Sequence, residues 1–328
     1  MKTELPETLQ ETIAKFSDES DAFEFVRSMR WPDGRAVCHF CKCRESYFLA
    51  SRRLWKCRDC RKVFSVRLGT IFEDSPIKLG KWIAALWLIA NAKNGISSYE
   101  IGRGLGVTQR TGWFVLQRIR LAMQNGSIEK LSGTVEVDES YIGAKARTMN
   151  AKQKARRREQ FGSSTGGVSM TPVQGLLQRS TRDKASQVVL QVVDGTKRPE
   201  LQGNVRKYVL KGAEVHTDAL RSYSGLAEDY AHEVIDHAKA YVRGNVHTNG
   251  LENFWSLLKR TIKGTYVSVE PFHLFRYLDE QAFRFNERKD DDQGRFLKVV
   301  TGIIGKRLTW KKLTGDADGL PPAAQTAE

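Results

Sequence analysis

Residues 134–142 read Thr-Val-Glu-Val-Asp-Glu-Ser-Tyr-Ile, and with this stretch a mixed pattern of strands and helices begins. Apolar and polar residues alternate along it, which is typical of a β-strand. Asp138 lies mid-strand and shares a face with Glu136, whereas Glu139 is predicted to point the other way. An unpaired buried carboxylate costs free energy, so Asp138 needs a basic partner or a metal ion.

Two more carboxylates lie at comparable places further along the chain. Asp218 directly follows a short predicted strand, and Glu252 lies on a predicted helix over residues 249–263. Two strand aspartates and a helix glutamate can hold two divalent cations about 3.5–4 Å apart, which suits phosphoryl transfer. Each acid also has an ordinary alternative: an ion pair for Asp138, a helix cap for Asp218, and a capping box with Asn249 for Glu252.

The pattern after residue 131 mixes strands and helices, and it predicts an α/β domain over residues 132–290. A basic and glycine-rich stretch at 145–167 is predicted to be a polar loop, and residues 291–328 are predicted to be a C-terminal tail. Strands are expected at 134–142, 173–178, 187–193, 213–216 and 232–236, and helices at 200–209, 249–263 and 271–286.

All five cysteines fall in one short window, and four of them form two Cys-x2-Cys pairs with fifteen residues between the pairs. Two such pairs can close a tetrahedron of thiolates around a structural zinc ion. The four predicted ligands are Cys38, Cys41, Cys57 and Cys60, and Cys43 and His39 are predicted to be bystanders. A helix and this zinc ribbon are expected to occupy residues 1–70.

Residues 71–131 contain three predicted helices, and the last two fit a helix-turn-helix. Gly106 would make the turn, and Thr108 would cap the second helix. That helix is predicted to expose Gln109, Arg110 and Arg118 to DNA. The alternative is a helical connector without a role in DNA binding.

The chain has 328 residues and a formal net charge of +15, which favours a polyanionic partner such as nucleic acid. Hydrophobic residues make up 40%, so a mainly disordered protein is excluded. The longest apolar run, residues 82–90, is too short to span a membrane. Acidic residues precede any apolar stretch at the N-terminus, so no secretory signal is predicted and an intracellular protein is expected.

Three blocks of the sequence resemble those of bacterial insertion-sequence transposases with an ISXO-like DDE domain. They are VEVDESYIG at 135–143, HTDALRSYSGL at 216–226 and HTNGLENFWSLLKR at 247–260, and RYLDEQAFRFNER at 276–288 resembles the family's C-terminal block. The double Cys-x2-Cys in front resembles the zinc ribbon that these enzymes often carry. The likeness extends over roughly residues 18–288.

The resemblance implies an RNase H-like catalytic domain that cuts and joins double-stranded DNA with Mg2+ or Mn2+. It gives Asp138 and Asp218 the roles of the two aspartates and Glu252 that of the third metal ligand. Lys259 matches the basic residue that contacts DNA near the element ends. Some relatives have asparagine in the third role, so Asn249 stays open as the alternative to Glu252.

By the same resemblance, the partners would be the terminal repeats of the element and the target DNA. At least a dimer would form on DNA, in the cytoplasm of a bacterium and associated with the nucleoid. Two other functions remain open from the sequence. One is a DNA-binding regulator whose α/β domain is inactive, and the other is a related nuclease that cuts DNA without joining it.

Overall fold

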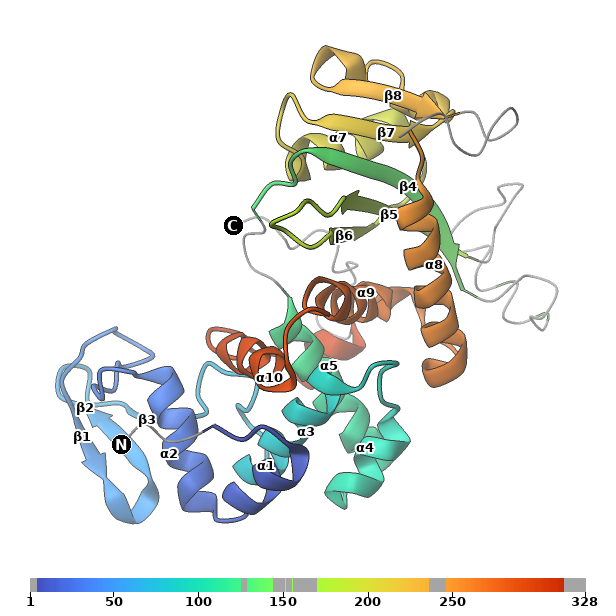
Figure 1. Cartoon of the computed structure of the whole chain (residues 1–328). Coiled ribbons are helices and arrows are strands. Elements are labelled where there is room, and N and C mark those ends of the chain that lie inside the picture. Colours follow the sequence, from blue (N-terminus) through green and yellow to red (C-terminus); the bar gives the residue numbers. More distant parts are fainter. Residues whose placement is uncertain are drawn as a thin grey trace. The chain divides into compact units, whose positions relative to one another are not determined.

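The computed structural model describes residues 5–124, 129–143, 151, 155, 170–235 and 246–315 (Figure 1). The chain divides into two compact units. The first runs to Asn125 and resumes at Asp290, and the second contains Gly126–Lys289. Most of the predicted loop at 145–167 and the chain after residue 315 lie outside the described residues.

The first unit begins with α1 (Leu9–Lys15) and α2 (Glu19–Arg30), followed by a ribbon of three antiparallel strands. The strands are β1 (Ser46–Leu49), β2 (Leu54–Cys57) and β3 (Val63–Ser65), in that spatial order. Trp55 on β2 is buried between Phe23 of α2 and Phe64 of β3, with ring centroids 5.8 and 6.2 Å away. This aromatic core holds the ribbon against α2.

Three further helices of this unit are α3 (Leu79–Asn91), α4 (Ser98–Leu105) and α5 (Gln109–Met123). A capping box between Ser97 and Glu100 starts α4, and Gly106 ends it with a φ of 63° that favours glycine. The Thr108 side chain then accepts a hydrogen bond from the Thr111 amide and caps α5. The turn between the two helices is therefore encoded locally, as the sequence predicts.

The described part of the predicted C-terminal tail is helical and belongs to the first unit. It contains α10 (Asp292–Thr301) and α11 (Trp310–Thr314). Phe296 is fully buried, and its ring lies 5.0 Å from Trp87 of α3 between centroids. Val299 and Val300 are buried beside it because spacings of three and four residues put all three on one helix face.

The second unit is built on a five-stranded sheet in the order β6-β5-β4-β7-β8. The central strand β4 pairs antiparallel with β5 and parallel with β7, so its two sides differ. β5 pairs antiparallel with β6, and β7 pairs parallel with β8. The strands are β4 (Thr134–Ile142), β5 (Thr171–Gln178), β6 (Gln187–Val192), β7 (Glu214–Asp218) and β8 (Ala231–Ile235).

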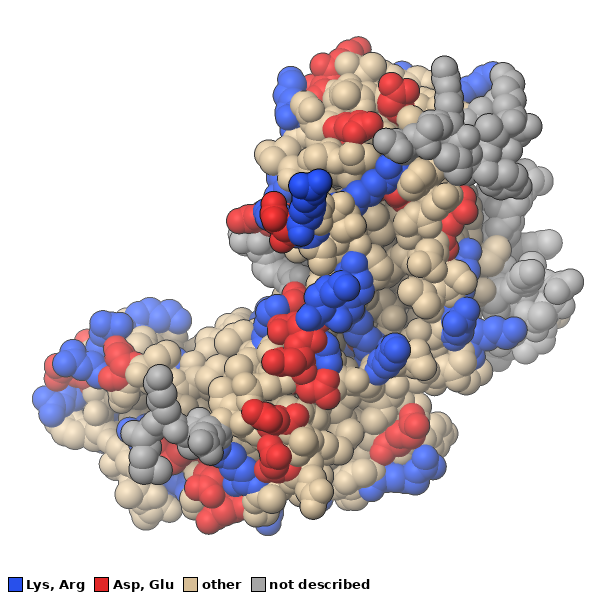
Figure 2. All heavy atoms as spheres, viewed as in Figure 1, with Lys and Arg blue, Asp and Glu red and all other residues tan. Residues whose placement is uncertain are grey.

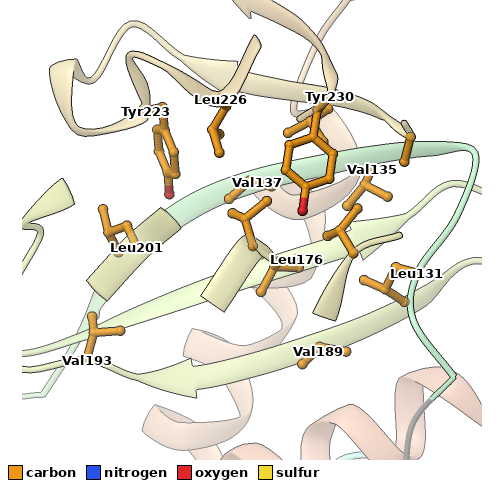
Figure 3. Packing of buried hydrophobic residues seen from close by; sticks show 14 residues of the cluster. Leu131, Val135, Val137, Leu176, Val189, Val193, Leu201, Tyr223, Leu226 and Tyr230 are labelled. Atoms are coloured by element: carbon orange, nitrogen blue, oxygen red, sulfur yellow. The ribbon is translucent and has the colours of Figure 1, made fainter. Parts of the chain in front are cut away.

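Helices cover both faces of this sheet. Val135 and Val137 of β4 face a core shared with α7 (Arg198–Tyr208), in which Leu201 and Val205 are also buried (Figure 3). The other face packs against α8 (Asn249–Thr261) and α9 (Pro271–Asn286). The mixed α/β domain expected from the sequence is therefore present as three layers.

Among the described residues, no helix combines the length and the apolar character that crossing a bilayer requires.

Candidate active site and metal centre

The four predicted zinc ligands meet in the ribbon. The Sγ atoms of Cys38, Cys41, Cys57 and Cys60 all lie within 4.8 Å of one another. Cys38 and Cys60 are 3.6 Å apart, and Cys41 and Cys57 are 3.5 Å apart. A tetrahedron with zinc–sulfur bonds of about 2.3 Å has edges of about 3.8 Å, so the four thiols fit one zinc ion.

The chemistry of these thiols also suits a metal. Burial opposes ionisation of Cys57, but hydrogen bonds from the Cys60 and Asp59 amides and the Cys41 thiol lower its pKa to about 7. Cys43 is outside the group of four, and its sulfur accepts a hydrogen bond from the Glu45 amide at 3.2 Å. The hydrogen bond between Cys43 and Asp59 raises the pKa of this thiol to about 11.

Basic side chains surround the ribbon. On the face shown in Figure 2 they gather over this part of the first unit, with a few acidic residues between them. Arg58 lies over the exposed Tyr47 ring at 4.6 Å, and Lys62 lies over the Phe40 ring at 4.7 Å. The ribbon therefore presents cations and aromatic rings together, a combination that suits nucleic acid.

A second group of possible metal ligands lies at the sheet of the second unit. Carboxylate oxygens of Asp138, Glu139 and Asp218 all lie within 4.8 Å of one another. β7 pairs with β4 as far as Val137 and ends at Asp218, so the next residues of β4 lie beside the end of β7. The strand order thus brings together acids that are 80 residues apart in the sequence.

Asp138 is held by a tryptophan from α8. Trp255 Nε1 donates a hydrogen bond to Asp138 Oδ2 at 2.9 Å. Gly175 stands opposite Asp138 on β5, and a Cβ there would approach the Trp255 ring to 2.7 Å, so only glycine leaves room for the indole. Burial raises the pKa of Asp138, the Trp255 bond and the Glu139 amide partly offset this, and the charges of Asp218 and Glu252 add to the increase.

Glu139 corrects one sequence expectation. Its place on β4 alternates to the face opposite Asp138 as predicted, but its carboxylate still lies within 4.8 Å of those of Asp138 and Asp218, beside the point where β7 ends. Tyr223 donates a hydrogen bond to Glu139, and Gln174 donates one to the Tyr223 hydroxyl at 3.1 Å. Burial, followed by the charges of Asp218 and Asp138, raises the pKa of Glu139 to about 8.

The residues predicted on α8 lie on its exposed side. Glu252, Asn249 and Lys259 are all exposed, and Leu251, Phe254, Trp255 and Leu258 are buried as the stripe predicts. Glu252 does not belong to the group of carboxylates within 4.8 Å of one another. Its charge still contributes to raising the pKa of Asp138. The structure thus gathers Asp138, Asp218 and Glu139 closely, with the helix that carries Glu252 bound to Asp138 through Trp255.

The three residues of α5 that were predicted to face DNA divide into two groups. Gln109 and Arg110 are exposed at the first turn of α5, as predicted. Arg118 is only 4% exposed and donates hydrogen bonds to the carbonyls of Ile71, Glu73 and Leu308. The prediction that Arg118 contacts DNA is wrong, because its guanidinium holds the segments on either side of α5 together inside the first unit.

Comparison with known proteins finds a matching family model in each of the two units. Residues 130–286 match the ISXO2-like transposase domain. Residues 17–63 match the transposase zinc-ribbon domain. Two separate parts of the chain are thus similar to domains of transposases. The chain is also 27% identical over 256 residues to an "uncharacterized protein in transposable element ISH50" of Halobacterium salinarum, and this match covers 76% of the chain and 84% of that protein.

The raised pKa of Glu139 predicts how the stability of the metal-free protein depends on pH. Its pKa is about 8 in the folded chain, above the ordinary value of 4.5, so the folded state keeps a proton that the unfolded state loses. Stability of the metal-free protein should therefore fall as pH rises from about 5 to 8. Thermal unfolding across this range, with and without Mn2+, measures the effect, and Mn2+ should restore stability most at pH 8.

Glu139→Gln should flatten this pH dependence, whereas the exposed Glu228→Gln should leave it unchanged. A Glu139→Gln variant whose unfolding temperature depends on pH as the parent's does would contradict the assignment.

Proposed function

We propose that this chain binds the ends of an insertion sequence and that its second unit cleaves DNA there and joins it to a target. The convergence of Asp138 and Glu139, in the middle of β4, with Asp218 at the end of β7 carries this proposal. Three carboxylates that repel one another are costly without a cation. An inactive domain that served only a DNA-binding regulator would have no physical reason to keep them together.

The sheet supports an RNase H-like fold for this unit. A central strand has an antiparallel hairpin partner on one side and parallel strands on the other, and the acids lie on that strand and at the end of its parallel neighbour. In sheets of this kind, ligands bind beyond the carboxyl ends of the parallel strands. Asp218 is placed there by β7.

Mg2+ or Mn2+ fits these residues because hard cations prefer carboxylate oxygens. Asp138 and Asp218 would hold the metal, with Glu252 as a third ligand. A pair of such ions held there would activate the attacking oxygen and stabilise the leaving one. Trp255 orients the Asp138 carboxylate through its hydrogen bond. Lys259 lies two turns after Glu252 on the exposed side of α8, where its ammonium can contact a DNA phosphate.

The third ligand is tested by two variants of α8. Glu252→Gln keeps the shape of the side chain and removes its charge, so it should abolish Mg2+-dependent cleavage of a terminal-repeat duplex without changing DNA binding. Asn249→Ala should reduce cleavage much less, because we assign Asn249 to the first turn of the helix and not to the metal. An active Glu252→Gln protein together with an inactive Asn249→Ala protein would reverse the two roles.

We propose that α4 and α5 form a helix-turn-helix that reads the terminal repeats through Gln109 and Arg110. In the structure, Gln109 donates a hydrogen bond to the Ser98 hydroxyl at 2.7 Å, and the Arg110 guanidinium lies 4.4 Å from the centre of the Trp310 ring. Each side chain is therefore held by a contact within the first unit when no DNA is bound. A bidentate contact to a base discriminates by about 1–3 kcal/mol. The double variant Gln109→Ala/Arg110→Ala should therefore lose about tenfold or more of its preference for terminal over random DNA.

This measurement needs the full chain, because α10 and α11 complete the first unit. Lys207→Ala, an exposed lysine of α7, is the control that removes charge away from the helix-turn-helix. A double variant with unchanged preference for the terminal repeat would show that another surface reads the sequence. Affinity for any DNA should also fall steeply with salt, because a protein of net charge +15 displaces counterions.

The proposal extends to assembly. Two ends of an element must be held together before they are joined to one target, so we expect at least two copies of the chain in the active complex with double-stranded DNA.

A further inference from the structure

One buried carboxylate close to Asp138, Glu139 and Asp218 has contacts that differ from those of these three acids. Glu136 lies two residues before Asp138 on the same face of β4 and is only 1% exposed. Its Oε1 atom accepts a hydrogen bond from Arg179 Nε at 2.7 Å, and its Oε2 atom accepts one from the Leu251 amide at 2.9 Å. Both oxygens are therefore occupied by donors of the protein.

The Leu251 amide belongs to the first turn of α8, where helices have unsatisfied amide groups. Thr248 is the residue before this helix, and its side chain makes no capping bond. Glu136 supplies the missing acceptor from a strand that is 115 residues away in the sequence. A negative charge at a helix N-terminus is also favoured by the helix dipole.

Arg179 ties the chain before α8 to the same point. It directly follows β5, and its Nη2 atom donates to the His247 carbonyl at 2.7 Å and lies 2.8 Å from His247 Nδ1. One carboxylate and one guanidinium thus connect β4, the end of β5 and the start of α8.

Gly250 shows how closely the helix approaches. A Cβ at this position would lie 2.8 Å from Glu136 Oε2 and 3.1 Å from Oε1, too close for any residue but glycine without a shift. By contrast, a Cβ at Gly203 of α7 would meet nothing within 4 Å. The backbone of α8 therefore rests directly on the Glu136 carboxylate.

We propose that Glu136, with Arg179, is a positioning residue that sets α8 against the catalytic strand. Glu136 fixes the first turn of α8, and Asp138 accepts the Trp255 hydrogen bond one turn later, so the two acids hold the helix at two points. This placement sets the distance from Glu252 to Asp138 and Asp218. The inference rests on the proposed metal-dependent cleavage.

A misplaced ligand helix should weaken metal binding before it affects DNA binding. Glu136→Gln keeps the size of the side chain but replaces one acceptor oxygen with an amide, so either Arg179 or Leu251 loses its partner. Gly250→Ala reaches the same contact from the helix side. Removal of such outer contacts commonly costs about 10–100-fold in metal affinity or activity.

The test measures cleavage of a terminal-repeat duplex against Mg2+ concentration, together with DNA affinity and the circular dichroism of each variant. Glu136→Gln and Gly250→Ala should each raise the Mg2+ concentration for half-maximal cleavage by about tenfold or more. DNA affinity should fall much less, because Lys259 is only one of the proposed DNA contacts, and Gly203→Ala should behave like the parent protein. The double variant should need no more Mg2+ than the more impaired of the two single variants, because both changes break the same contact between Glu136 and α8.

Hydrogen exchange gives a second measurement that does not depend on activity. The Leu251 amide should exchange faster in Glu136→Gln, while amides in the middle of α9 should keep their protection. Parental Mg2+ dependence and parental exchange at Leu251 in Glu136→Gln would overturn the positioning role. If Asp138→Asn also cleaved DNA normally, the proposed function itself would fail, so the two failures are distinguishable.

Discussion

Asp138→Asn is expected to reduce Mg2+-dependent cleavage of the element ends by at least about a thousandfold, because the loss of several kcal/mol of transition-state stabilisation at a two-metal site has this effect. Asparagine keeps an oxygen that can accept the Trp255 hydrogen bond, so the local fold should persist. The rate of strand cleavage at saturating DNA measures the effect.

The same substitution should leave the metal-free protein at least as stable as the parent near pH 8. Burial and the neighbouring acids raise the pKa of Asp138, which means that its ionised form is disfavoured in the folded chain. Asp183→Asn removes an exposed carboxylate from the same unit and should change neither quantity. Cleavage at the parental rate by Asp138→Asn would remove Asp138 from the active site.

Cys57→Ser is expected to release the zinc ion and unfold the ribbon. Cys57 is fully buried at the end of β2, and its sulfur lies 3.5 Å from that of Cys41. Zinc binding contributes about 10 kcal/mol or more to the folding of small metal domains, far more than the short ribbon strands can supply. Metal analysis should change from about one zinc per chain to none.

Cys43→Ser is the matched control, because Cys43 follows the first Cys-x2-Cys pair closely but lies outside the group of four sulfurs. It should retain zinc and the near-ultraviolet signal of the buried Trp55 and its aromatic neighbours. Zinc retained by Cys57→Ser, or lost from Cys43→Ser, would show that the ligand set is different.

Local patterns in the sequence predicted much of this fold. The alternation over residues 134–142 predicted β4 with its bounds, and the apolar stripe of α8 is buried as expected. The start of α5 at Thr108 and the turn at Gly106 follow from short-range hydrogen bonds and from glycine's freedom to adopt a positive φ. These features depend on residues only a few positions apart, which is why the sequence reveals them.

Features that depend on distant contacts were missed. Arg118 has the same charge and helical setting as an exposed arginine, and only the carbonyls of Ile71, Glu73 and Leu308 make it a buried residue. Glu139 joins the acids because β7 stops beside it, and a strand's neighbours are not visible in its own sequence. The apolar spacing of Phe296, Val299 and Val300, by contrast, was a local signal for α10.

We propose that this chain cuts and joins DNA at an acid site formed by β4 and β7. The most direct measurement incubates the full chain with a duplex carrying one terminal repeat, a supercoiled target plasmid and Mg2+, and then sequences the products. We predict covalent junctions between the 3′ end of the repeat and the target, which should be absent for Asp138→Asn and when EDTA replaces Mg2+. Cleaved repeats without any junctions would indicate a nuclease that does not join DNA, and junctions formed equally by Asp138→Asn would contradict the site.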